Sequence, residues 1–501
     1  MMGCVTLVGA GPGDPGLLTR AGAKALARAD LVVYDRLVGP EILALIPEGA
    51  ERVDVGKQAA NHPVPQGEIN RILLDGALAG KNVVRLKGGD PFLFGRGGEE
   101  LELLSEHGVP FREIPGVTSA IAAPAYGGIP VTHRDYTSSL HIVTGHQRAG
   151  KALDIDFGAL VRTGGTLVFL MGVSALPAIC AGLLAAGLEP STPAAVVERG
   201  ATPAQRRIDA TVDTLPGAAE RAGVESPAVI VVGRVCALAP RFCWFDALPL
   251  RGRTLVVTRP RARAGTLSER LRALGAEVLE YPCIETQPIL PNPPAQRALD
   301  GLGAYRWLAL TSPAGAEALW ALLEARGQDA RALGGVKLAA IGPGTDRALR
   351  GHGLRADLVP EVYDAAHLGA ALAEEATGRV LLLRAEKASP ELPAALDGAG
   401  LAYDDVALYR TIYENSRSED LRALLEGDKI DGVTFTSAST VKGFAATVGE
   451  DFDFSRVTGF CIGAQTAAEA GRYGIRTKTA RSAAMDALER LIEEELQHGT
   501  H

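Results

Sequence analysis

The stretch VVRLKGGDPFLFGRGGEE, Val83 to Glu100, carries a short strand-like run directly into two glycines, an aspartate and a proline. Glycine has no side chain, so a ligand or another backbone can approach the main chain closely at such a position. A similar arrangement, VTLVGAGPGDPG, begins at Val5. The stretch at Val83 therefore permits either a ligand close to the main chain or an ordinary turn at Asp90 and Pro91.

Short apolar runs alternate with helical stretches along the whole chain of 501 residues, which is typical of β-α units and mostly parallel sheets. This length is too great for one core and predicts three or four domains. Residues 241–254 interrupt the rhythm, so we place a boundary there, with domains at 1–246 and 253–501 and a linker at 247–252. The predicted fold class is α/β.

The second domain contains a weak internal repeat, because YRWLALTSPAG at 305 resembles DGVTFTSAST at 431. The order of the repeated pieces predicts two similar lobes joined by two crossing strands, a two-stranded hinge. Lobe A would contain about 253–287 plus 412–498, and lobe B about 290–408.

Charge and composition exclude several classes of protein. The net charge of −8 argues against general nucleic-acid binding. Six dispersed cysteines and nine histidines show no metal-binding spacing, so no metal is predicted. The absence of a basic leader or a long apolar run predicts a soluble cytoplasmic protein with no membrane partner. The runs EELE at 99 and EEE at 493 are interpreted as solvated helix faces.

The first glycine loop alone also permits a dinucleotide site, with Asp35 on the ribose, but the match is poor. Pro12 removes an amide from the loop, and the third glycine of that fingerprint is missing. A different resemblance extends over residues 3–246. Its blocks are LVGAGPGDPGLLT, YDRLV, VGK, VVRLKGGDPFLFGRGGEE, GIPVTHR, TLVFLMG and SPAVIVVG.

These blocks resemble the uroporphyrinogen-III C-methyltransferases of the tetrapyrrole methylase superfamily. The resemblance implies a two-domain methylase fold, with subdomains at about 1–134 and 137–246, and a homodimer formed through this half. It also implies S-adenosylmethionine as methyl donor, with S-adenosylhomocysteine as product, bound between the subdomains. The implied cofactor contacts are Pro12, Gly88, Gly89, Asp90, Leu93, Thr118, Ser119, Met171, Gly200 and Ala228. Asp90 before Pro91 is also an ordinary turn former, and Met171 and Leu93 could be core residues.

The resemblance further implies that Asp35 and Lys57 accept and donate protons during methyl transfer. Asp35 could instead cap a loop, and Lys57 could pair with a substrate carboxylate. Arg36, Arg96 and Arg134 are candidates for binding the carboxylates of a tetrapyrrole substrate, although each could be a surface arginine.

In the second half, Thr311, Ser312, Ser437 and Thr466 follow predicted strands, where they could cap helices or line a cleft that binds carboxylates. Similar helix starts are expected at Thr345 and Thr466. The blocks TRP, TSP, AIGPGT, ALYRT and TFTSAS resemble uroporphyrinogen-III synthase over about 252–495. This resemblance implies a bilobal fold, closure of hydroxymethylbilane with inversion of its last ring, and Tyr409 as proton donor.

The two resemblances share one intermediate, so the sequence predicts a bifunctional enzyme that acts on small-molecule tetrapyrroles. It would form uroporphyrinogen III and methylate it twice to precorrin-2, on the sirohaem or cobalamin route. One alternative is a methylase for a later corrin precursor, fused to a non-catalytic tetrapyrrole-binding module. A bilobal solute-binding protein is another.

Overall fold

The computed structural model describes residues 2–47, 49–56, 64–145, 153–259, 261–413, 418–449 and 451–497; for residues 261–266 it describes the backbone alone. The chain forms two compact units, Met1–Gly252 and Arg253–His501, which are described separately. The α/β class predicted from the sequence is confirmed, because each unit contains two five-stranded sheets covered by helices.

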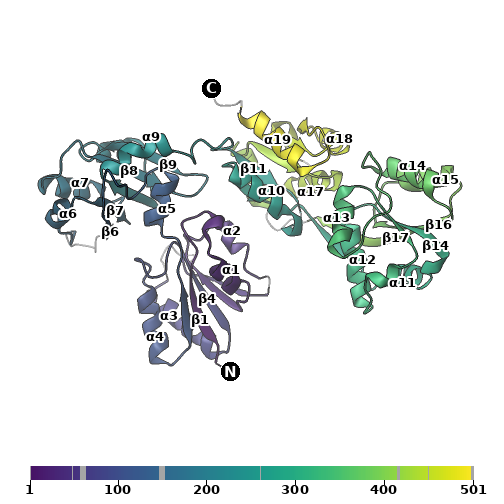
Figure 1. Cartoon of the computed structure of the whole chain (residues 1–501), viewed down its shortest axis with the longest axis horizontal. Helices are drawn as coiled ribbons and strands as arrows, with labels where there is room; N and C mark the ends of the chain where they lie inside the picture. Colours follow the sequence, from purple (N-terminus) through teal and green to yellow (C-terminus); the bar gives the residue numbers. More distant parts are fainter. Residues whose placement is uncertain are drawn as a thin grey trace. The chain divides into compact units, whose positions relative to one another are not determined.

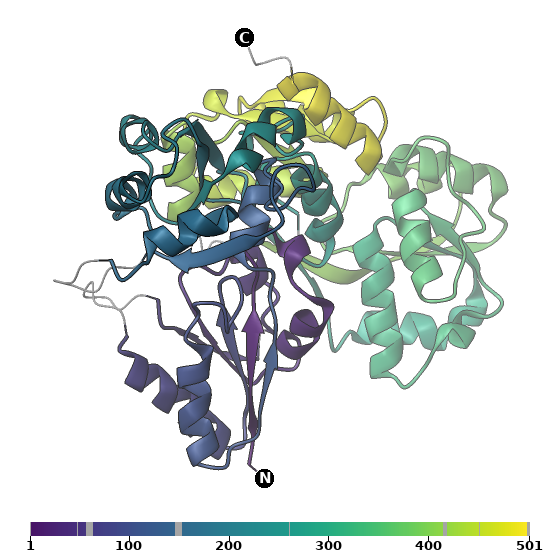
Figure 2. The ribbon, with the colours of Figure 1, turned by 60° about the vertical axis from the view of Figure 1, so that its left-hand side comes forward.

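The first sheet of the first unit is wholly parallel, in the order β3-β2-β4-β1-β5. Its central strands are apolar because helices cover both faces (Figures 1 and 2). The strands are β1 (Cys4–Gly9), β2 (Leu31–Tyr34), β3 (Glu51–Asp54), β4 (Asn82–Lys87) and β5 (Phe111–Ile114); the helices are α1 (Arg20–Leu26), α2 (Pro40–Leu43), α3 (Gln66–Leu78) and α4 (Gly97–Glu106).

The second sheet of this unit is mixed, in the order β6-β7-β10-β8-β9. Only β6 and β7 pair in parallel, and the other neighbours are antiparallel. The strands are β6 (Leu140–Thr144), β7 (Thr166–Leu170), β8 (Pro193–Glu198), β9 (Arg206–Thr211) and β10 (Ala228–Val232); the helices are α5 (Ser119–Tyr126), α6 (Phe157–Thr163), α7 (Leu176–Ala185), α8 (Leu215–Arg221) and α9 (Ala239–Phe242).

Helix α5 belongs to the second sheet, which differs from the predicted subdomain boundary near residue 134. Ala120 and Ala123 are buried in one cluster with Val168, Val197 and Val229 of that sheet. Small alanine side chains let the helix lie close to the strands, and this packing determines which sheet the helix joins. The change of subdomain therefore falls between β5 and α5.

The second unit contains a parallel sheet, β12-β11-β18-β19-β20, which we call lobe A. Its strands come from both ends of the unit, since β11 and β12 precede the other sheet in the chain and β18 to β20 follow it. The elements are β11 (Thr254–Val257), α10 (Arg261–Ala273), β12 (Glu277–Glu280), α16 (Ser418–Glu426), β18 (Gly432–Phe435), α17 (Ala438–Val448), β19 (Thr458–Cys461), α18 (Ala464–Arg472), β20 (Arg476–Thr479) and α19 (Met485–Gln497).

The other sheet of the second unit, β13-β17-β16-β14-β15, forms lobe B. Strand β13 pairs antiparallel with the long strand β17, and these two strands lead from lobe A into lobe B and back. The elements are β13 (Ile284–Pro288), α11 (Pro293–Asp300), β14 (Tyr305–Leu310), α12 (Pro313–Ala325), β15 (Lys337–Ala340), α13 (Pro343–Gly351), α14 (Ala365–Glu375), β16 (Arg379–Ala385), α15 (Glu391–Gly398) and β17 (Tyr403–Tyr413). Short 3-10 turns lie at Pro15–Leu17, Arg234–Leu238, Leu302–Ala304, Ala330–Leu333 and Phe454–Arg456.

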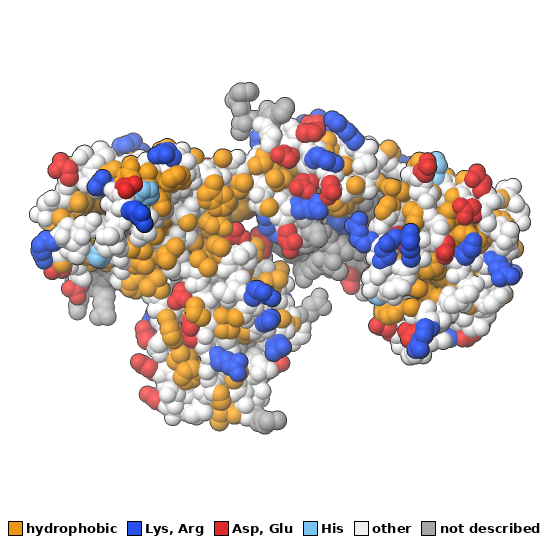
Figure 3. Space-filling view, in the orientation of Figure 1, with side chains coloured by type: hydrophobic (Ala, Val, Ile, Leu, Met, Phe, Trp, Pro, Cys, Tyr) orange, Lys and Arg blue, Asp and Glu red, His pale blue; other side chains and the backbone are white. Residues whose placement is uncertain are grey.

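Acidic and basic side chains are interspersed over the face drawn in Figure 3. Within the described ranges, no helix combines the length and apolar character needed to cross a bilayer. The same residues contain no group of three or more His, Cys, Asp or Glu side chains placed to hold a metal ion. All six cysteines are free thiols.

Candidate functional site

Three glycines meet where β1, β4 and β5 end. A Cβ atom added to Gly9 would lie 2.4 Å from the Cα of Gly116 and 2.7 Å from the carbonyl oxygen of Gly89. The amide of Gly11 donates to the Gly89 carbonyl at 3.1 Å, and the Gly89 amide donates to the Gly11 carbonyl at 2.7 Å. The two glycine-rich stretches of the sequence therefore form one main-chain surface at the carboxyl edge of a parallel sheet, where α/β proteins commonly bind ligands.

Asp90 holds this surface in place. Its Oδ1 accepts hydrogen bonds from the amides of Phe92 and Leu93, both at 2.9 Å. Its Oδ2 accepts from the Gly116 amide at 3.1 Å, which ties the loop after β4 to the loop after β5. Asp90 thus shapes the loop as a turn former, and a Cβ atom on the neighbouring Gly88 would lie 2.8 Å from the Cβ of Leu37.

The start of helix α5 faces the glycine surface. Thr118 is the N-cap and accepts a hydrogen bond from the Ala120 amide at 3.2 Å. A Cβ atom on Gly89 would meet only the Ser119 amide nitrogen, at 3.9 Å, and would otherwise project into open space. Leu93 packs against the same apolar cluster as α5. Gly89, Thr118 and Ser119 are therefore brought together by the fold.

Three further predicted residues lie at one edge of the second sheet. Met171 follows β7 with a φ of 55° and is 49% exposed. Ala228 begins β10, and Gly200 follows β8; strand register places the end of β7 and the end of β8 beside the start of β10. Gly200 is packed so closely on α5 that an added Cβ would lie 2.3 Å from the Cβ of Ala123.

The loop that contains Pro12 reaches this second sheet. Tyr126 of α5 donates its hydroxyl to Asp14 Oδ2 at 2.5 Å. A Cβ atom on Gly13 would meet the side chain of Thr202 at 2.5 Å. The first glycine loop therefore touches both the end of α5 and the turn between β8 and β9 through Asp14 and Gly13, which follow Pro12 in the chain.

Asp35 lies one residue beyond β2 and is held by a buried arginine. Arg85 Nη2 donates to Asp35 Oδ1 at 2.6 Å, and Arg85 Nε donates to Glu100 Oε1 at 3.0 Å. Lys87 Nζ donates to the same Glu100 oxygen at 2.8 Å. Arg85 and Glu100 are almost completely buried, whereas the Asp35 side chain is 31% exposed.

The interpretation of EELE at 99 as a wholly solvated face was therefore wrong at Glu100, which is fully buried. The sequence reasoning missed Arg85, Lys87 and Glu100 as part of a site. A signal was present, because Arg85 and Lys87 are two apart on an apolar strand and so point to the same buried face. A buried face with two cations requires a carboxylate nearby.

The remaining predicted polar residues of this half are more scattered. Lys57 lies outside the described residues. Arg36 and Arg134 are exposed. Arg96 is the N-cap of α4 with a φ of 58°, and its guanidinium forms two hydrogen bonds with Glu99, at 2.9 and 2.6 Å. This exposed ion pair leaves Arg96 accessible to solvent.

In lobe B, Tyr409 and Ser312 lie side by side. The Tyr409 hydroxyl is 2.8 Å from Ser312 Oγ. Ser312 is also the N-cap of α12, where its Oγ accepts a hydrogen bond from the Gly315 amide at 2.9 Å. Tyr409 is 7% exposed on β17, the long strand of the crossing pair, and Thr311 directly follows β14. A predicted proton donor and a predicted substrate contact thus share one hydrogen bond.

In lobe A, Ser437 forms a capping box with Thr440 at the start of α17. The helix starts expected at Thr345 and Thr466 differ from prediction: α13 and α18 begin at Pro343 and Ala464 and have glycine N-caps without a side-chain bond. Both threonines are buried within the first turn. The first amides of these two helices consequently lack a side-chain cap.

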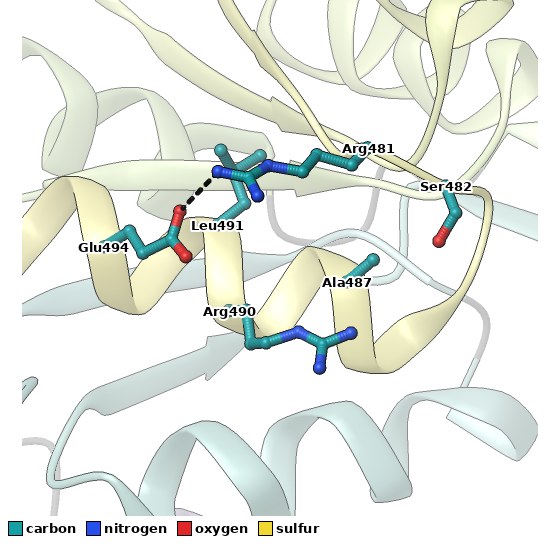
Figure 4. A pocket seen from close by; sticks show the side chains of 6 residues that line it. All are labelled: Arg481, Ser482, Ala487, Arg490, Leu491 and Glu494. Atoms are coloured by element: carbon teal, nitrogen blue, oxygen red, sulfur yellow. Dashed lines mark ion pairs between the residues drawn. The ribbon is translucent and has the colours of Figure 1, made fainter.

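A shallow pocket of about 270 Å³ lies along α19 (Figure 4). Arg481 and Glu494 form an ion pair of 3.9 Å across it. It is lined by Arg481, Ser482, Ala487, Arg490, Leu491 and Glu494, and includes none of the predicted site residues.

Two family models match separate parts of the chain. Residues 4–216 match the family described as Tetrapyrrole (Corrin/Porphyrin) Methylases. Residues 265–489 match the family described as Uroporphyrinogen-III synthase HemD. The fold and these matches define an α/β enzyme with a methylase half and a synthase half.

A protein of Ruminiclostridium josui named Porphyrin biosynthesis protein HemD is 48% identical over 494 residues, 98% of each chain. The present chain belongs to this family, in which a tetrapyrrole methylase precedes a HemD-type synthase. Siroheme synthase of Pseudomonas putida strain W619 is 50% identical over 244 residues, which are 49% of this chain and 52% of that protein. The chain thus spans about half the length of the siroheme synthase.

Two solved structures are similar to separate halves. Uroporphyrin-III C-methyltransferase from Thermus thermophilus, complexed with S-adenyl homocysteine, is 44% identical, with 47% of this chain and 100% of that chain covered and a TM-score of 0.41. A mutant uroporphyrinogen III synthase, also from Thermus thermophilus, is 19% identical, with 49% of this chain and 99% of that chain covered and a TM-score of 0.39.

Proposed function

We propose that the chain converts hydroxymethylbilane to uroporphyrinogen III, with inversion of the last ring, and then methylates this product twice to precorrin-2. The route would lead to sirohaem or cobalamin. The observation that carries the proposal is the presence, in one chain, of a family that makes uroporphyrinogen III and a family that methylates tetrapyrroles. The product of the second half would be the substrate of the first.

The residues of the methylase half fit S-adenosylmethionine as methyl donor. Gly9 and Gly116 leave no room for a side chain, because an added Cβ would lie 2.4 Å from the Cα of Gly116 and 2.1 Å from the carbonyl oxygen of Gly89, respectively, whereas a Cβ on Gly89 would project into open space near the Ser119 amide. The exposed Met171 would offer the donor an apolar contact. Bound there, the donor supplies an electrophilic methyl group, and Pro12, Gly88 to Asp90, Leu93, Thr118, Ser119, Gly200 and Ala228 would orient it.

The chain's own groups would position the macrocycle and move its protons. Arg36, Arg96 and Arg134 would bind substrate carboxylates, because guanidinium groups form paired hydrogen bonds with them. Asp35 stands at the same sheet edge as the glycine surface, and its partly exposed carboxylate would accept the proton that leaves the macrocycle. Lys57 would return a proton. Alignment of the reacting carbon would provide most of the acceleration.

In the synthase half, Tyr409 would donate the proton that the leaving hydroxyl of the bilane requires. Ser312 Oγ lies 2.8 Å from the Tyr409 hydroxyl and would orient the Tyr409 hydroxyl. Thr311, Ser437 and Thr466 would contact the substrate at the starts of helices, where free amides bind carboxylates. We further propose a homodimer through the methylase half, which light scattering would test.

Two half-reactions test the function with the intact protein. Bilane alone should give uroporphyrinogen III, and Tyr409→Phe should give mostly the uninverted isomer that forms without an enzyme. Uroporphyrinogen III with S-adenosylmethionine should give a doubly methylated product, and Asp35→Asn should abolish it. A methylated product only from a later corrin precursor would overturn the assignment of the first half.

A further inference from the structure

Four charged side chains of the first unit form a connected cluster: Asp35 after β2, Arg85 and Lys87 of β4, and Glu100 of α4. Three of them are at most 5% exposed, and only Asp35 reaches solvent. The cluster contains two cations and two anions. In a poorly hydrated interior, charges at hydrogen-bond distance influence one another far more strongly than charges on the surface.

The hydrogen bonds of the cluster connect Glu100 to Asp35 through Arg85. Glu100 Oε1 accepts from Arg85 at 3.0 Å, from Lys87 at 2.8 Å and from Gln66 Nε2 at 3.2 Å. Arg85 is thereby fixed so that its outer nitrogen, Nη2, meets Asp35. The other oxygen of Glu100, Oε2, is buried and has no hydrogen-bond partner among the described residues.

We propose that Lys87 and Glu100 are positioning residues of the methylase half, which act through Arg85 to set the proton affinity of the Asp35 carboxylate. The inference rests on the proposed function only in treating Asp35 as the proton acceptor. Burial, followed by the charge of Arg85, lowers the pKa of Lys87, and the neighbouring Glu100 carboxylate opposes this shift. The charged groups around Asp35 are Arg85 and Lys87 of β4, Glu100 of α4, Asp54 at the end of β3 and the adjacent Arg36.

The signs of the expected effects follow from charge. Lys87→Met or Lys87→Gln removes a cation and leaves the cluster with a net negative charge, which favours protonated Asp35. The midpoint of Asp35 titration should rise by about one pH unit. The double variant Lys87→Met with Glu100→Gln removes one charge of each sign, so its midpoint should return to that of the wild type. Glu100→Gln alone should not raise the midpoint.

The midpoint can be measured without turnover, by carbon NMR of protein labelled at the aspartate carboxyl carbons, with Asp35→Asn identifying the signal. The acidic limb of the kcat profile for methyl transfer should move by the same amount. Glu102→Gln, on the exposed face of α4, and Lys81→Met, at a surface ion pair, are the matched controls and should leave both values unchanged.

A purely structural role would lower the thermal midpoint without moving the titration. The inference is overturned if Lys87→Met and Lys87→Gln titrate like the wild type, or if the double variant stays as high as the single one. A rise in Glu100→Gln also overturns it. Absence of methyl transfer in the wild type would overturn the proposed function alone, because the NMR midpoint still decides the inference.

Discussion

Replacement of Gly89 by alanine separates the proposed cofactor contact from simple loss of stability. Gly89 has a φ of 69°, a conformation that costs a residue with a side chain about 1–2 kcal/mol. The added Cβ would not clash with the protein, because its nearest neighbour is the Ser119 amide at 3.9 Å. It would instead occupy the space in which the methyl donor is proposed to lie against the main chain.

Gly108 provides a matched control. Its φ is 66°, and a Cβ there would have no neighbour within 4 Å. Gly108 follows α4 at the end opposite to the glycine surface. Both variants should therefore lose about 1–2 kcal/mol of stability, which corresponds to a fall in thermal midpoint of about 2–8 °C for a domain of this size.

Isothermal titration with S-adenosylhomocysteine should then distinguish the two variants. We expect Gly89→Ala to bind at least about tenfold more weakly, a loss of about 1.4 kcal/mol, whereas Gly108→Ala binds like the wild type. Equal affinity in the two variants would refute the placement of the donor at Gly89. Equal thermal midpoints of Gly89→Ala and Gly108→Ala, with weaker binding only in Gly89→Ala, would support the placement of the donor at Gly89 most clearly.

Three other outcomes are expected. Tyr409→Phe should lower kcat for ring closure by about 10²-fold or more, without affecting methylation of supplied uroporphyrinogen III; an unchanged rate would remove Tyr409 as proton donor. Ser312→Ala should lower the free energy of unfolding in urea by about 1 kcal/mol, because α12 loses its N-cap, and should also slow ring closure. Unchanged stability together with an unchanged rate would contradict the shared hydrogen bond. Burial raises the pKa of Cys236 and of Cys283 to about 12, so both should resist iodoacetamide at pH 8 until the protein is unfolded, as peptide mass mapping would show; rapid labelling of native Cys283 would contradict its burial.

The alternation of apolar strands and helical stretches was sufficient to predict the α/β class, because this periodicity is local. The position of α5 was not predictable in the same way. Its sequence, SAIAAPAY, is apolar on every side, so it could cover either sheet, and only packing with Val168 and Val229 shows which one it joins. A subdomain boundary that depends on this packing cannot be predicted from local sequence.

The site shows the same limit. The glycine loops were recognisable because the lack of a side chain is itself visible in the sequence. Glu100 was missed because one buried carboxylate in a run of glutamates looks like its solvated neighbours until the helix is placed over Arg85 and Lys87. Thr345 and Thr466 were expected at helix starts, but the helices begin at the preceding proline and alanine, after glycines in extended conformation.

Incubation of the intact chain with hydroxymethylbilane and S-adenosylmethionine, followed by mass spectrometry of the products, tests the central claim most directly. The account predicts a cyclic tetrapyrrole with two added methyl groups, formed without any other enzyme. Two results would contradict the claim that one chain performs both reactions. One is an unmethylated macrocycle as the only product, with the donor unconsumed. The other is ring closure of the bilane no faster than its spontaneous reaction without the protein.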